Sequence, residues 1–396
     1  MKTIRELALA GKRVLLRVDF NVPLDERGKV ADRTRIEAAL PTIQHLRQQG
    51  ARVILISHLG RPEGEKLARY SLRPVAEALE LLLKHPVRFC DDCVGESVQR
   101  AASELRDGEL LLLENLRFYK EETENDPTFA QKLAALAEAY VDDAFGCAHR
   151  AHASTVGVTK FLSPCAAGLL VEKELSYLGE KISHPERPLS IILGGAKVSD
   201  KIGIIQALLD RADKMLIGGA MAYTFSAALG HAVGRSLVEP DKFDVALAAM
   251  AKAKQRDICL LLPVDHIVSD SVDCTARTVG TLRTVKENEL RERDIAVDIG
   301  PKTVALYSQT IANSKTVLWN GPMGIFEITD CAVGTLAIAR AAAESPATSI
   351  IGGGDSIKAV RESGYASKIS FMSTGGGASL EYLEGKILPG IAALDD

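Results

Sequence analysis

The stretch Leu189-Ser-Ile-Ile-Leu193-Gly-Gly-Ala-Lys197 joins a short, mainly apolar run to a glycine loop and a lysine. A run of this length, bounded by a turn signal, predicts a strand that is buried on both faces, as in a parallel sheet. Helix-period sequence follows the loop, so the segment has the order of a βα unit. The same order recurs along the chain and predicts a fold of consecutive βα units.

The predicted strands fall into two groups. In the first half they are Arg13 to Phe20, Arg52 to Ser57, Val87 to Cys90, Leu110 to Leu113 and Tyr140 to Ala144. In the second half they are Leu189 to Leu193, Lys214 to Ile217, Ile258 to Leu262, Thr316 to Trp319, Thr348 to Ile351 and Ile369 to Met372. Between the groups, Pro164 can open a helix and His184-Pro185 can close it, which predicts one linking helix over Pro164 to Ser183. The fold class is therefore α/β, with two doubly wound parallel-sheet (Rossmann-like) domains joined by a helix and a cleft between them.

Composition narrows the class of protein. At roughly 150 residues per domain, 396 residues predict two or three domains. The 46% hydrophobic and 25% charged residues are typical of a globular chain and argue against disorder and coiled coils. With 48 basic and 52 acidic residues there is no basic excess for a nucleic acid, so any bound anion must be held locally. No apolar run approaches 18 residues and Met1 to Arg13 lacks a signal-peptide core, so we expect a cytoplasmic protein without a membrane span.

A few residues that could bind a metal or cofactor are interpreted as structural. The seven cysteines are scattered and odd in number, which indicates free thiols. Cys90-Asp-Asp-Cys93 is the only CxxC, and without a second pair it predicts neither zinc nor redox chemistry. His149 and His152 lack a third ligand at metal spacing, which favours a structural or anion-contacting role. Trp319 lies within an apolar strand and is expected in the core.

Charged residues follow the predicted strands of the first half. They are Asp19-Phe20-Asn21, His58-Leu59-Gly60-Arg61, Asn115-Leu116-Arg117, Asp142-Asp143 with His149-Arg150 beyond it, and Arg35 after the first strand. Each arginine by itself reads as a solvated surface charge. Ligands of open parallel sheets bind beyond the carboxyl ends of the strands, however, and four arginines and a histidine there predict a pocket for a small anion carrying phosphate or carboxylate.

Glycine loops follow the predicted strands of the second half. They are Gly194-Gly195-Ala196-Lys197, Gly218-Gly219-Ala220, Asn320-Gly321-Pro322, Gly352-Gly353-Gly354-Asp355-Ser356 and Gly375-Gly376-Gly377-Ala378. One such loop is usually a tight turn, but five on one sheet predict a nucleotide site, because backbone N–H groups can approach phosphates there. Neither a GxGxxG fingerprint nor a P-loop is present.

Three side chains in these loops carry charge suited to a nucleotide. Lys197 and Lys201 are four residues apart, so we expect both on one face of an opening helical turn, directed at the phosphates. Asp355 follows three glycines at a strand end and could hold Mg²⁺, although an N-cap of the next helix is the plainer interpretation.

With these residues placed, the chain resembles the phosphoglycerate kinase family over essentially its whole length. The matching segments are Arg17-Val-Asp19-Phe-Asn21-Val-Pro23, Asp32-Arg-Thr-Arg35-Ile36, Ser57-His58-Leu-Gly-Arg61-Pro62, Glu114-Asn-Leu-Arg117-Phe118, His149-Arg150-Ala-His-Ala-Ser154, Leu193-Gly-Gly-Ala-Lys197-Val-Ser-Asp-Lys201, Trp319-Asn-Gly-Pro-Met-Gly-Ile-Phe-Glu327, Gly352-Gly-Gly-Asp355-Ser356 and Ser373-Thr-Gly-Gly-Gly-Ala378. Two departures are minor: Cys147 and Ser356 stand where many relatives carry threonine.

The resemblance implies a domain arrangement and a set of site residues. Residues 1–170 would form a domain binding 3-phosphoglycerate, residues 171–376 a domain binding Mg-nucleotide, and residues 377–396 a tail that packs back on the first domain. The implied substrate-binding residues are Asp19, Phe20, Asn21, Arg35, His58, Leu59, Gly60, Arg61, Arg117 and Arg150; the nucleotide-binding residues are Lys201, Glu327, Gly353, Gly354, Asp355 and Ser356. Arg35, Lys197, Gly375 and Gly376 would act at the transferred phosphoryl group, and Asp355 would hold the Mg²⁺ of Mg-ATP or Mg-ADP.

The implied reaction is the reversible, in-line transfer of a phosphoryl group from ATP to the carboxylate of 3-phosphoglycerate. A carboxylate is already ionised at neutral pH, so no general base is required, and the site must supply positioning and charge neutralisation. Because the two sets of residues lie in different domains, we expect hinge-bending closure. We also expect a monomer with no nucleic-acid or membrane partner.

Two other classes of protein fit less well. A two-lobed binding protein that closes on a small anion would have no need for Lys197 and Lys201 beside five glycine loops. An NAD-linked dehydrogenase would need the dinucleotide fingerprint and an acidic residue about 20 positions later.

Overall fold

The computed structural model describes residues 1–395 and divides them into two compact units. Unit 1 comprises Met1–Ser176, Gly377–Tyr382 and the described residues from Lys386 onward. Unit 2 comprises Tyr177–Gly376 and Leu383–Gly385. The last part of the chain therefore belongs to the same unit as the first part.

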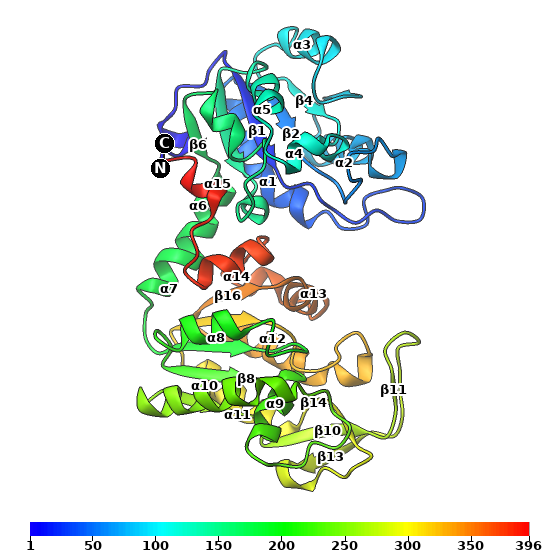
Figure 1. Ribbon diagram of the computed structural model, residues 1–396, viewed down its shortest axis with the longest axis vertical. Coiled ribbons are helices and arrows are strands. Elements are labelled where there is room, and N and C mark those ends of the chain that lie inside the picture. The colour runs from blue at the N-terminus through cyan, green and yellow to red at the C-terminus, as the bar shows by residue number, and fades with distance from the viewer. Residues whose placement is uncertain (396) are drawn as a thin grey trace. The chain divides into compact units, whose positions relative to one another are not determined.

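Unit 1 is built on a six-stranded parallel sheet. Its strands are β1 (Arg13–Val18), β2 (Arg52–Ile56), β3 (Val87–Cys90), β4 (Leu110–Leu113), β5 (Ala139–Asp143) and β6 (Cys165–Ala167), in the spatial order β3-β4-β2-β1-β5-β6. The blue strands β1 and β2 lie side by side in Figure 1, with Val14 opposite Val53. Both faces of the sheet are covered, so that every residue of β4 and β5 is buried.

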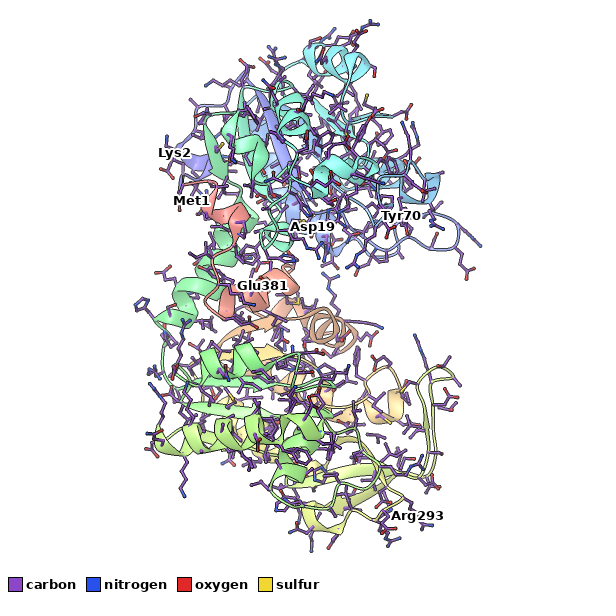
Figure 2. All side chains as sticks on the ribbon, viewed as in Figure 1. Met1, Lys2, Asp19, Tyr70, Arg293 and Glu381 are labelled. Carbon is purple, nitrogen blue, oxygen red and sulfur yellow. The ribbon has the colours of Figure 1, made fainter. Side chains whose placement is uncertain are left out.

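Helices connect these strands and complete the core of unit 1. They are α1 (Thr34–Gln48), α2 (Arg73–Leu83), α3 (Glu96–Ser103), α4 (Lys120–Thr123), α5 (Pro127–Ala134), α6 (Leu169–Glu174) and α15 (Pro389–Ala392), together with most of α14 (Gly377–Leu383). The chain start also binds to this unit, because Ala167 N donates to Lys2 O at 2.9 Å and the Met1 amino group pairs with Asp395. Figure 2 labels Met1 and Lys2 beside the red helix α15.

Unit 2 is built on a second six-stranded parallel sheet. Its strands are β7 (Leu189–Leu193), β8 (Lys214–Ile217), β9 (Cys259–Leu261), β15 (Thr316–Asn320), β16 (Thr348–Gly352) and β17 (Phe371–Met372), in the order β17-β16-β15-β7-β8-β9. Trp319 is fully buried in the central strand β15 and packs with Ile192, Tyr307 and Ile351, which confirms its prediction as a core residue.

The remaining elements of unit 2 surround this sheet and extend it. The helices are α7 (Lys181–Ser183), α8 (Ile202–Leu208), α9 (Met221–Ala228), α10 (Phe243–Gln255), α11 (Pro301–Ala312), α12 (Val333–Glu344) and α13 (Gly354–Glu362). A small antiparallel sheet has the order β13 (Arg283–Lys286), β10 (Asp265–Ser269), β14 (Ile295–Ile299), and a two-stranded ribbon joins β11 (Val272–Asp273) to β12 (Thr278–Val279). The sequence did not predict this antiparallel part.

The α/β fold class with two parallel sheets is confirmed, but the predicted linking helix is wrong in its first part. Pro164 does not open a helix: the residues after it, Cys165–Ala167, form β6 beside β5. The helical stretch begins at Leu169 and continues through a π-helical segment, η6 (Leu175–Glu180), to α7, which ends at Ser183 as predicted. The division between the units, at Ser176 and Tyr177, falls within this stretch.

None of the helices in residues 1–395 is both long and apolar enough to span a membrane.

Candidate active site

Both parallel sheets have a point at which the order of the strands reverses, and the predicted site residues follow the strands at these points. In unit 1 the chain runs from β1 to β2 on one side and later places β5 on the other side of β1. In unit 2, β8 and β15 lie on opposite sides of β7 in the same way. Crevices at such switch points, beyond the carboxyl ends of the strands, are where open α/β sheets bind ligands.

Hydrogen bonds connect the residues after β1 to the residues after β2 and β4. The Arg35 guanidinium pairs with the Asp19 carboxylate, which lies just beyond the strand in Figure 2, and Asn21 Oδ1 accepts from Gly60 N at 2.9 Å. Arg117 Nη1 donates to Gly60 O at 2.8 Å. Phe20 and Leu59 are buried and support this backbone rather than face solvent. The loops from three neighbouring strands are thereby fixed to one another.

Three of the four predicted arginines line one cavity. Arg61, Arg117 and Arg150, together with Glu63, Gly64, Tyr119 and Thr123, border a space of about 200 Å³, so three guanidinium groups outnumber the one carboxylate in its lining. Arg35 is not among its lining residues and is instead held by Asp19. A space of this size with three guanidinium groups at its wall suits a small anion with phosphate or carboxylate groups, since planar guanidinium groups bind such oxygens in pairs.

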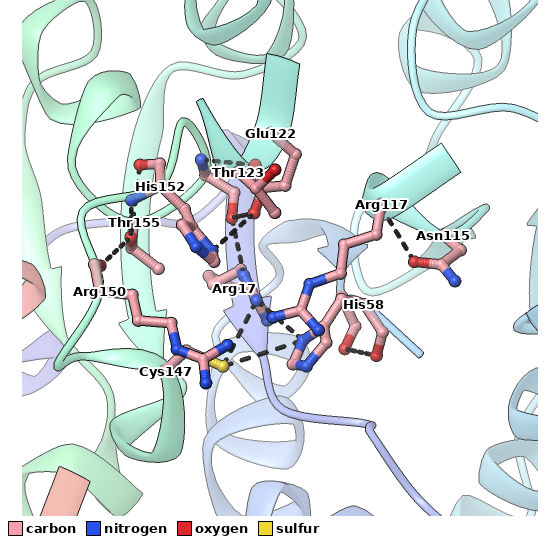
Figure 3. A network of polar contacts seen from close by, with 12 residues as sticks. Arg17, His58, Asn115, Arg117, Glu122, Thr123, Cys147, Arg150, His152 and Thr155 are labelled. Carbon is pink, nitrogen blue, oxygen red and sulfur yellow. Dashed lines mark hydrogen bonds and ion pairs between the residues drawn. The ribbon is translucent and has the colours of Figure 1, made fainter. Parts of the chain in front are cut away.

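A buried polar network lies behind this wall, and Figure 3 shows it. Arg17, on β1, is fully buried, and its Nε donates to Ser154 Oγ at 2.9 Å. Ser154 Oγ in turn donates to Glu122 Oε1 at 2.6 Å, while Ser154 N donates to Glu122 Oε2 at 3.0 Å. The Nη2 atom of Arg17 lies 3.2 Å from His58 Nδ1. The network therefore connects a buried acid to the predicted substrate-binding histidine.

Burial and the guanidinium charges keep the histidines of this region neutral. Burial lowers the pKa of His58 well below its ordinary value, and the charge of Arg17 lowers it further. Burial and the charge of Arg117 lower the pKa of His152 to about 4. Burial raises the pKa of Glu122, while Arg17 opposes this shift. At neutral pH the histidines are hydrogen-bonding groups, and the positive charge of the pocket comes from its arginines.

Sequence reasoning did not give Glu122 a role and did not recognise Arg17 and Ser154 as its partners. One signal was available: Arg17 lies between apolar residues in the interior of β1, and a buried charge requires a buried partner. The identity of that partner could not be read from the sequence, because Ser154 is 137 positions away from Arg17.

Asp19, His58 and Cys147 place ligand atoms within 4.8 Å of one another. Arg17 donates to Cys147 Sγ at 3.5 Å and also contacts His58 Nδ1, so a positive guanidinium already engages two of these three ligand atoms. His149 and His152 are engaged separately: His149 accepts from Arg150 Nε at 3.1 Å, and His152 Nδ1 lies 3.8 Å from Glu122. Their interpretation as structural or anion-contacting residues therefore fits these contacts.

One thiol of the CxxC, that of Cys93, is poorly suited to redox chemistry. Cys93 is buried, and burial raises the pKa of its thiol well above the ordinary value. Reactive cysteines need the opposite shift.

Close backbone packing explains three of the glycine loops in unit 2. Gly194 N donates to Asn320 O at 2.9 Å, and Gly195 N donates to Pro322 O at 2.9 Å. A Cβ atom on Gly194 would lie 2.1 Å from Pro322 O, and one on Gly219 would lie 2.5 Å from Gly195 N. These loops follow β7, β8 and β15, so glycine allows the ends of three neighbouring strands to meet.

The two predicted lysines do not lie on one helical turn. Helix α8 begins only at Ile202, and Lys197 lies in the loop before it, exposed to solvent. The helix starts late because a turn intervenes, in which Lys201 N donates to Val198 O at 2.8 Å. Lys201 Nζ donates to Asn320 Oδ1, at the end of β15, and burial lowers its pKa. Lys201 is thus fixed on the sheet edge, whereas Lys197 is free to reach a ligand.

Asp355 does not cap α13. Gly353 occupies the N-cap position with a φ of 87°, and Asp355 lies exposed in the first turn of the helix. The neighbouring Ser356 is buried and accepts a hydrogen bond from Gly321 N at 2.7 Å. Glu327 is exposed, and the loop of Gly375 and Gly376 follows β17, with Gly375 N donating to Ser373 Oγ at 3.3 Å.

The chain is similar to known proteins over its whole length. The family model described as phosphoglycerate kinase matches residues 4–386. The phosphoglycerate kinase of Koribacter versatilis is 53% identical, with 99% of this chain and 98% of that protein covered, and that of Gloeothece citriformis is 55% identical, with 100% and 99% covered. The solved phosphoglycerate kinase structure from Coxiella burnetii matches with a TM-score of 0.89 at 40% identity, covering 99% of this chain and 98% of that one. With a family model over residues 4–386 and relatives this similar across both units, the chain belongs to the phosphoglycerate kinase family and is a phosphotransferase.

Proposed function

We propose that unit 1 binds 3-phosphoglycerate in the cavity lined by Arg61, Arg117 and Arg150, and that unit 2 binds the Mg-nucleotide at its glycine loops. The reaction of the family is the reversible transfer of the terminal phosphoryl group of ATP to the carboxylate of 3-phosphoglycerate, giving ADP and 1,3-bisphosphoglycerate. The single observation that carries the assignment is the arginine-lined cavity of about 200 Å³ in unit 1. Asp19, Asn21, Arg35 and His58 complete the substrate site, supported by Phe20, Leu59 and Gly60.

The residues of unit 1 act by binding and orienting the acceptor. The attacking carboxylate is ionised at neutral pH and needs no base. Its own charge and that of the phosphate must be neutralised before it can approach ATP, and the guanidinium groups supply this neutralisation in a fixed geometry. Arg35 is held by Asp19 and would act at the transferred group.

The residues of unit 2 hold the nucleotide and its transferred charge. Backbone N–H groups of Gly353, Gly354, Gly375 and Gly376 would approach the phosphates, and Lys201, Glu327 and Ser356 would fix the rest of the nucleotide. Lys197 is exposed on a short loop, so its ammonium group can stay beside the phosphoryl group as this group passes from one substrate to the other.

The exposed carboxylate of Asp355 fits a magnesium ion, which usually takes one or two protein carboxylates and completes its shell with phosphate oxygens and water. When bound, the ion neutralises phosphate charge. Asp355 contributes by orienting its carboxylate from the first turn of α13.

Because the two sets of residues belong to different units, transfer requires closure, and the helical stretch from Leu169 to Ser183 is the proposed hinge. Small-angle scattering with and without both substrates tests this step: a smaller radius of gyration is expected only when both are bound. An unchanged radius would contradict closure. We also propose that the chain acts as a monomer in a reducing compartment such as the cytoplasm, which its seven free cysteines support.

The experiment that tests the function measures ADP release from MgATP with and without 3-phosphoglycerate, with a trap for the acyl phosphate product. Release should depend on 3-phosphoglycerate and fall about 10²-fold or more in Lys197→Ala, because one preorganised charge at the reacting group contributes that much. The matched control is Lys254→Ala, an exposed lysine of α10 in the same unit, which should retain wild-type release. Substrate-independent release, or equal rates for the two variants, would contradict the assignment of Lys197.

A further inference from the structure

The groups around one nitrogen of His58 determine where its proton lies. His58 Nδ1 is 3.2 Å from Arg17 Nη2 and 3.8 Å from Cys147 Sγ. A guanidinium can only donate hydrogen bonds, and burial raises the pKa of the Cys147 thiol to about 12, so the sulfur keeps its proton at neutral pH. Arg17 can act only as a donor to Nδ1 and the thiol can donate as well, so Nδ1 accepts.

The proton of the neutral ring then belongs to the other nitrogen, Nε2. No hydrogen bond formed within residues 1–395 reaches this atom, whereas Nδ1 has two neighbours. A ring in this state presents one N–H donor to a ligand and no positive charge. An oxygen of the substrate is the matching acceptor.

The donor to Nδ1 is itself held on its other side. Arg17 Nε donates to Ser154 Oγ, Arg17 Nη1 donates to Val18 O, and both oxygens of Glu122 accept from Ser154, as an ionised carboxylate does. Figure 3 shows this line of contacts from Glu122 through Arg17 to His58. Glu122 is fully buried in α4, so it cannot exchange these partners for water.

We propose that Glu122 and Ser154 are positioning residues that act through Arg17 to hold His58 as its Nε2–H tautomer, in which the ring donates a hydrogen bond to an oxygen of bound 3-phosphoglycerate. The inference rests on the proposed role of His58 in substrate binding. It assigns a function to a buried acid outside the predicted substrate-binding residues, and it gives a role to the arginine in the interior of β1.

The tautomer can be measured directly in the unliganded wild-type protein. Two-dimensional ¹⁵N NMR of the imidazole rings distinguishes a protonated Nε2 from a protonated Nδ1, and the signal that disappears in His58→Gln identifies His58 among the eight histidines. We expect Nε2 to carry the proton and Nδ1 to be bare. A ring protonated at Nδ1 would overturn the proposal whatever the function of the protein is.

Kinetics of Ser154→Ala test the positioning role. The variant keeps both buried charges but removes the hydroxyl that fixes the Arg17 guanidinium. We expect both tautomers of His58 to be populated and the KM for 3-phosphoglycerate to rise about twofold or more, because only the fraction with a protonated Nε2 can donate to the substrate. The KM for MgATP should not change, because the nucleotide residues belong to unit 2.

Glu122→Gln and Glu121→Gln form a matched pair for the acid itself. They remove the same charge from adjacent residues of α4, one buried and one exposed. Only Glu122→Gln should shift the tautomer and the KM for 3-phosphoglycerate. Three results would indicate a purely structural role and overturn the proposal. The first is an unchanged tautomer in both Ser154→Ala and Glu122→Gln. The others are a shifted tautomer with an unchanged KM for 3-phosphoglycerate, and a rise in the KM values for both substrates.

The His58→Gln variant separates the two hypotheses. Loss of 3-phosphoglycerate binding in this variant supports the role of His58. If binding is retained, the proposed substrate site is wrong at this residue even where the NMR result holds.

Discussion

Arg17 is a fully buried charge whose stability depends on Glu122 and Ser154. Replacing it with methionine leaves the Glu122 carboxylate buried without its main counter-charge. Breaking a buried pair in this way costs about 3–5 kcal/mol, so Arg17→Met should lower the free energy of unfolding of unit 1 by that amount. Urea unfolding followed by far-ultraviolet circular dichroism measures the change.

Arg13→Met is the control for this substitution, because Arg13 begins the same strand and its Nε atom pairs with the half-exposed Glu138 at 3.5 Å. Surface pairs contribute about 0–1 kcal/mol. Equal losses of stability in the two variants would show that the burial of Arg17 has no special cost.

The sequence predicts where these charged residues lie relative to the strands better than it predicts their contacts. Arg61, Arg117 and Arg150 follow strands, and the parallel order of those strands brings them to one cavity. Arg35 belongs to the same predicted set, but its carboxylate partner Asp19 places it elsewhere. Side-chain pairing depends on packing between distant segments, which no local pattern encodes.

At the scale of elements, the loops after β7 and β15 are joined so closely that glycine is required. A Cβ atom on Gly194 would meet the carbonyl oxygens of Pro322 and Gly321 at 2.1 and 2.6 Å. Gly194→Ala should therefore destabilise unit 2 by about 3 kcal/mol, as overpacking against backbone does. Urea unfolding followed by the fluorescence of Trp319 measures the effect. Gly354→Ala is the control, because a Cβ atom at this helical position meets open space. Its free energy of unfolding should be unchanged or slightly higher.

The start of α12 is held by an acid on β14, and the burial of this acid should make stability depend on pH. Asp298, on β14, accepts from Gly334 N at 2.6 Å, and burial raises its pKa to about 7. Between pH 4 and pH 7 the folded state then binds more protons at this group than the unfolded state does. Its contribution to stability is therefore greatest below pH 4 and is lost as the pH rises through 7.

Asp298→Asn keeps an acceptor for Gly334 N but removes the ionisation. The free energy of unfolding is measured at pH 5 and at pH 8 by Trp319 fluorescence. It should decrease less between these two pH values in the variant than in the wild type. An identical fall in both proteins would show that another group is responsible.

All eleven predicted strands are present to within two residues, whereas several short or polar strands were not predicted. Every residue of β4 and β7 is buried, and both strands were predicted with their observed bounds. β10 contains Asp265 and His266, and β6 is only the three residues Cys165–Ala167. Short strands with polar or small residues carry no distinctive period, and the proline before β6 resembles the start of a helix.

At the scale of the molecule, the end of the chain stabilises the unit in which the chain begins. Leu388 is 2% exposed, and Gly390 N donates to Ala148 O at 2.9 Å, two residues before Arg150. Leu388→Ala should lower the stability of unit 1 by about 2–5 kcal/mol and weaken 3-phosphoglycerate binding. MgADP binding by unit 2 should be retained, as titration calorimetry would show.

The adjacent residue provides the control for the tail. Ile387 is 83% exposed, so Ile387→Ala should change stability by no more than about 0.5 kcal/mol. If both variants unfold like the wild type, the tail contributes nothing to unit 1.

The return of the chain to unit 1 has a consequence for the order of events during protein synthesis. Unit 2 is almost continuous over residues 177–376, whereas unit 1 needs residues that are translated after all of these. At a ribosomal rate of about 5–20 residues per second, the first segment waits roughly 10–40 s for its last pieces. On the ribosome, the unit that begins first is therefore completed last, and its unfinished surface is the one that chaperones would have to shield.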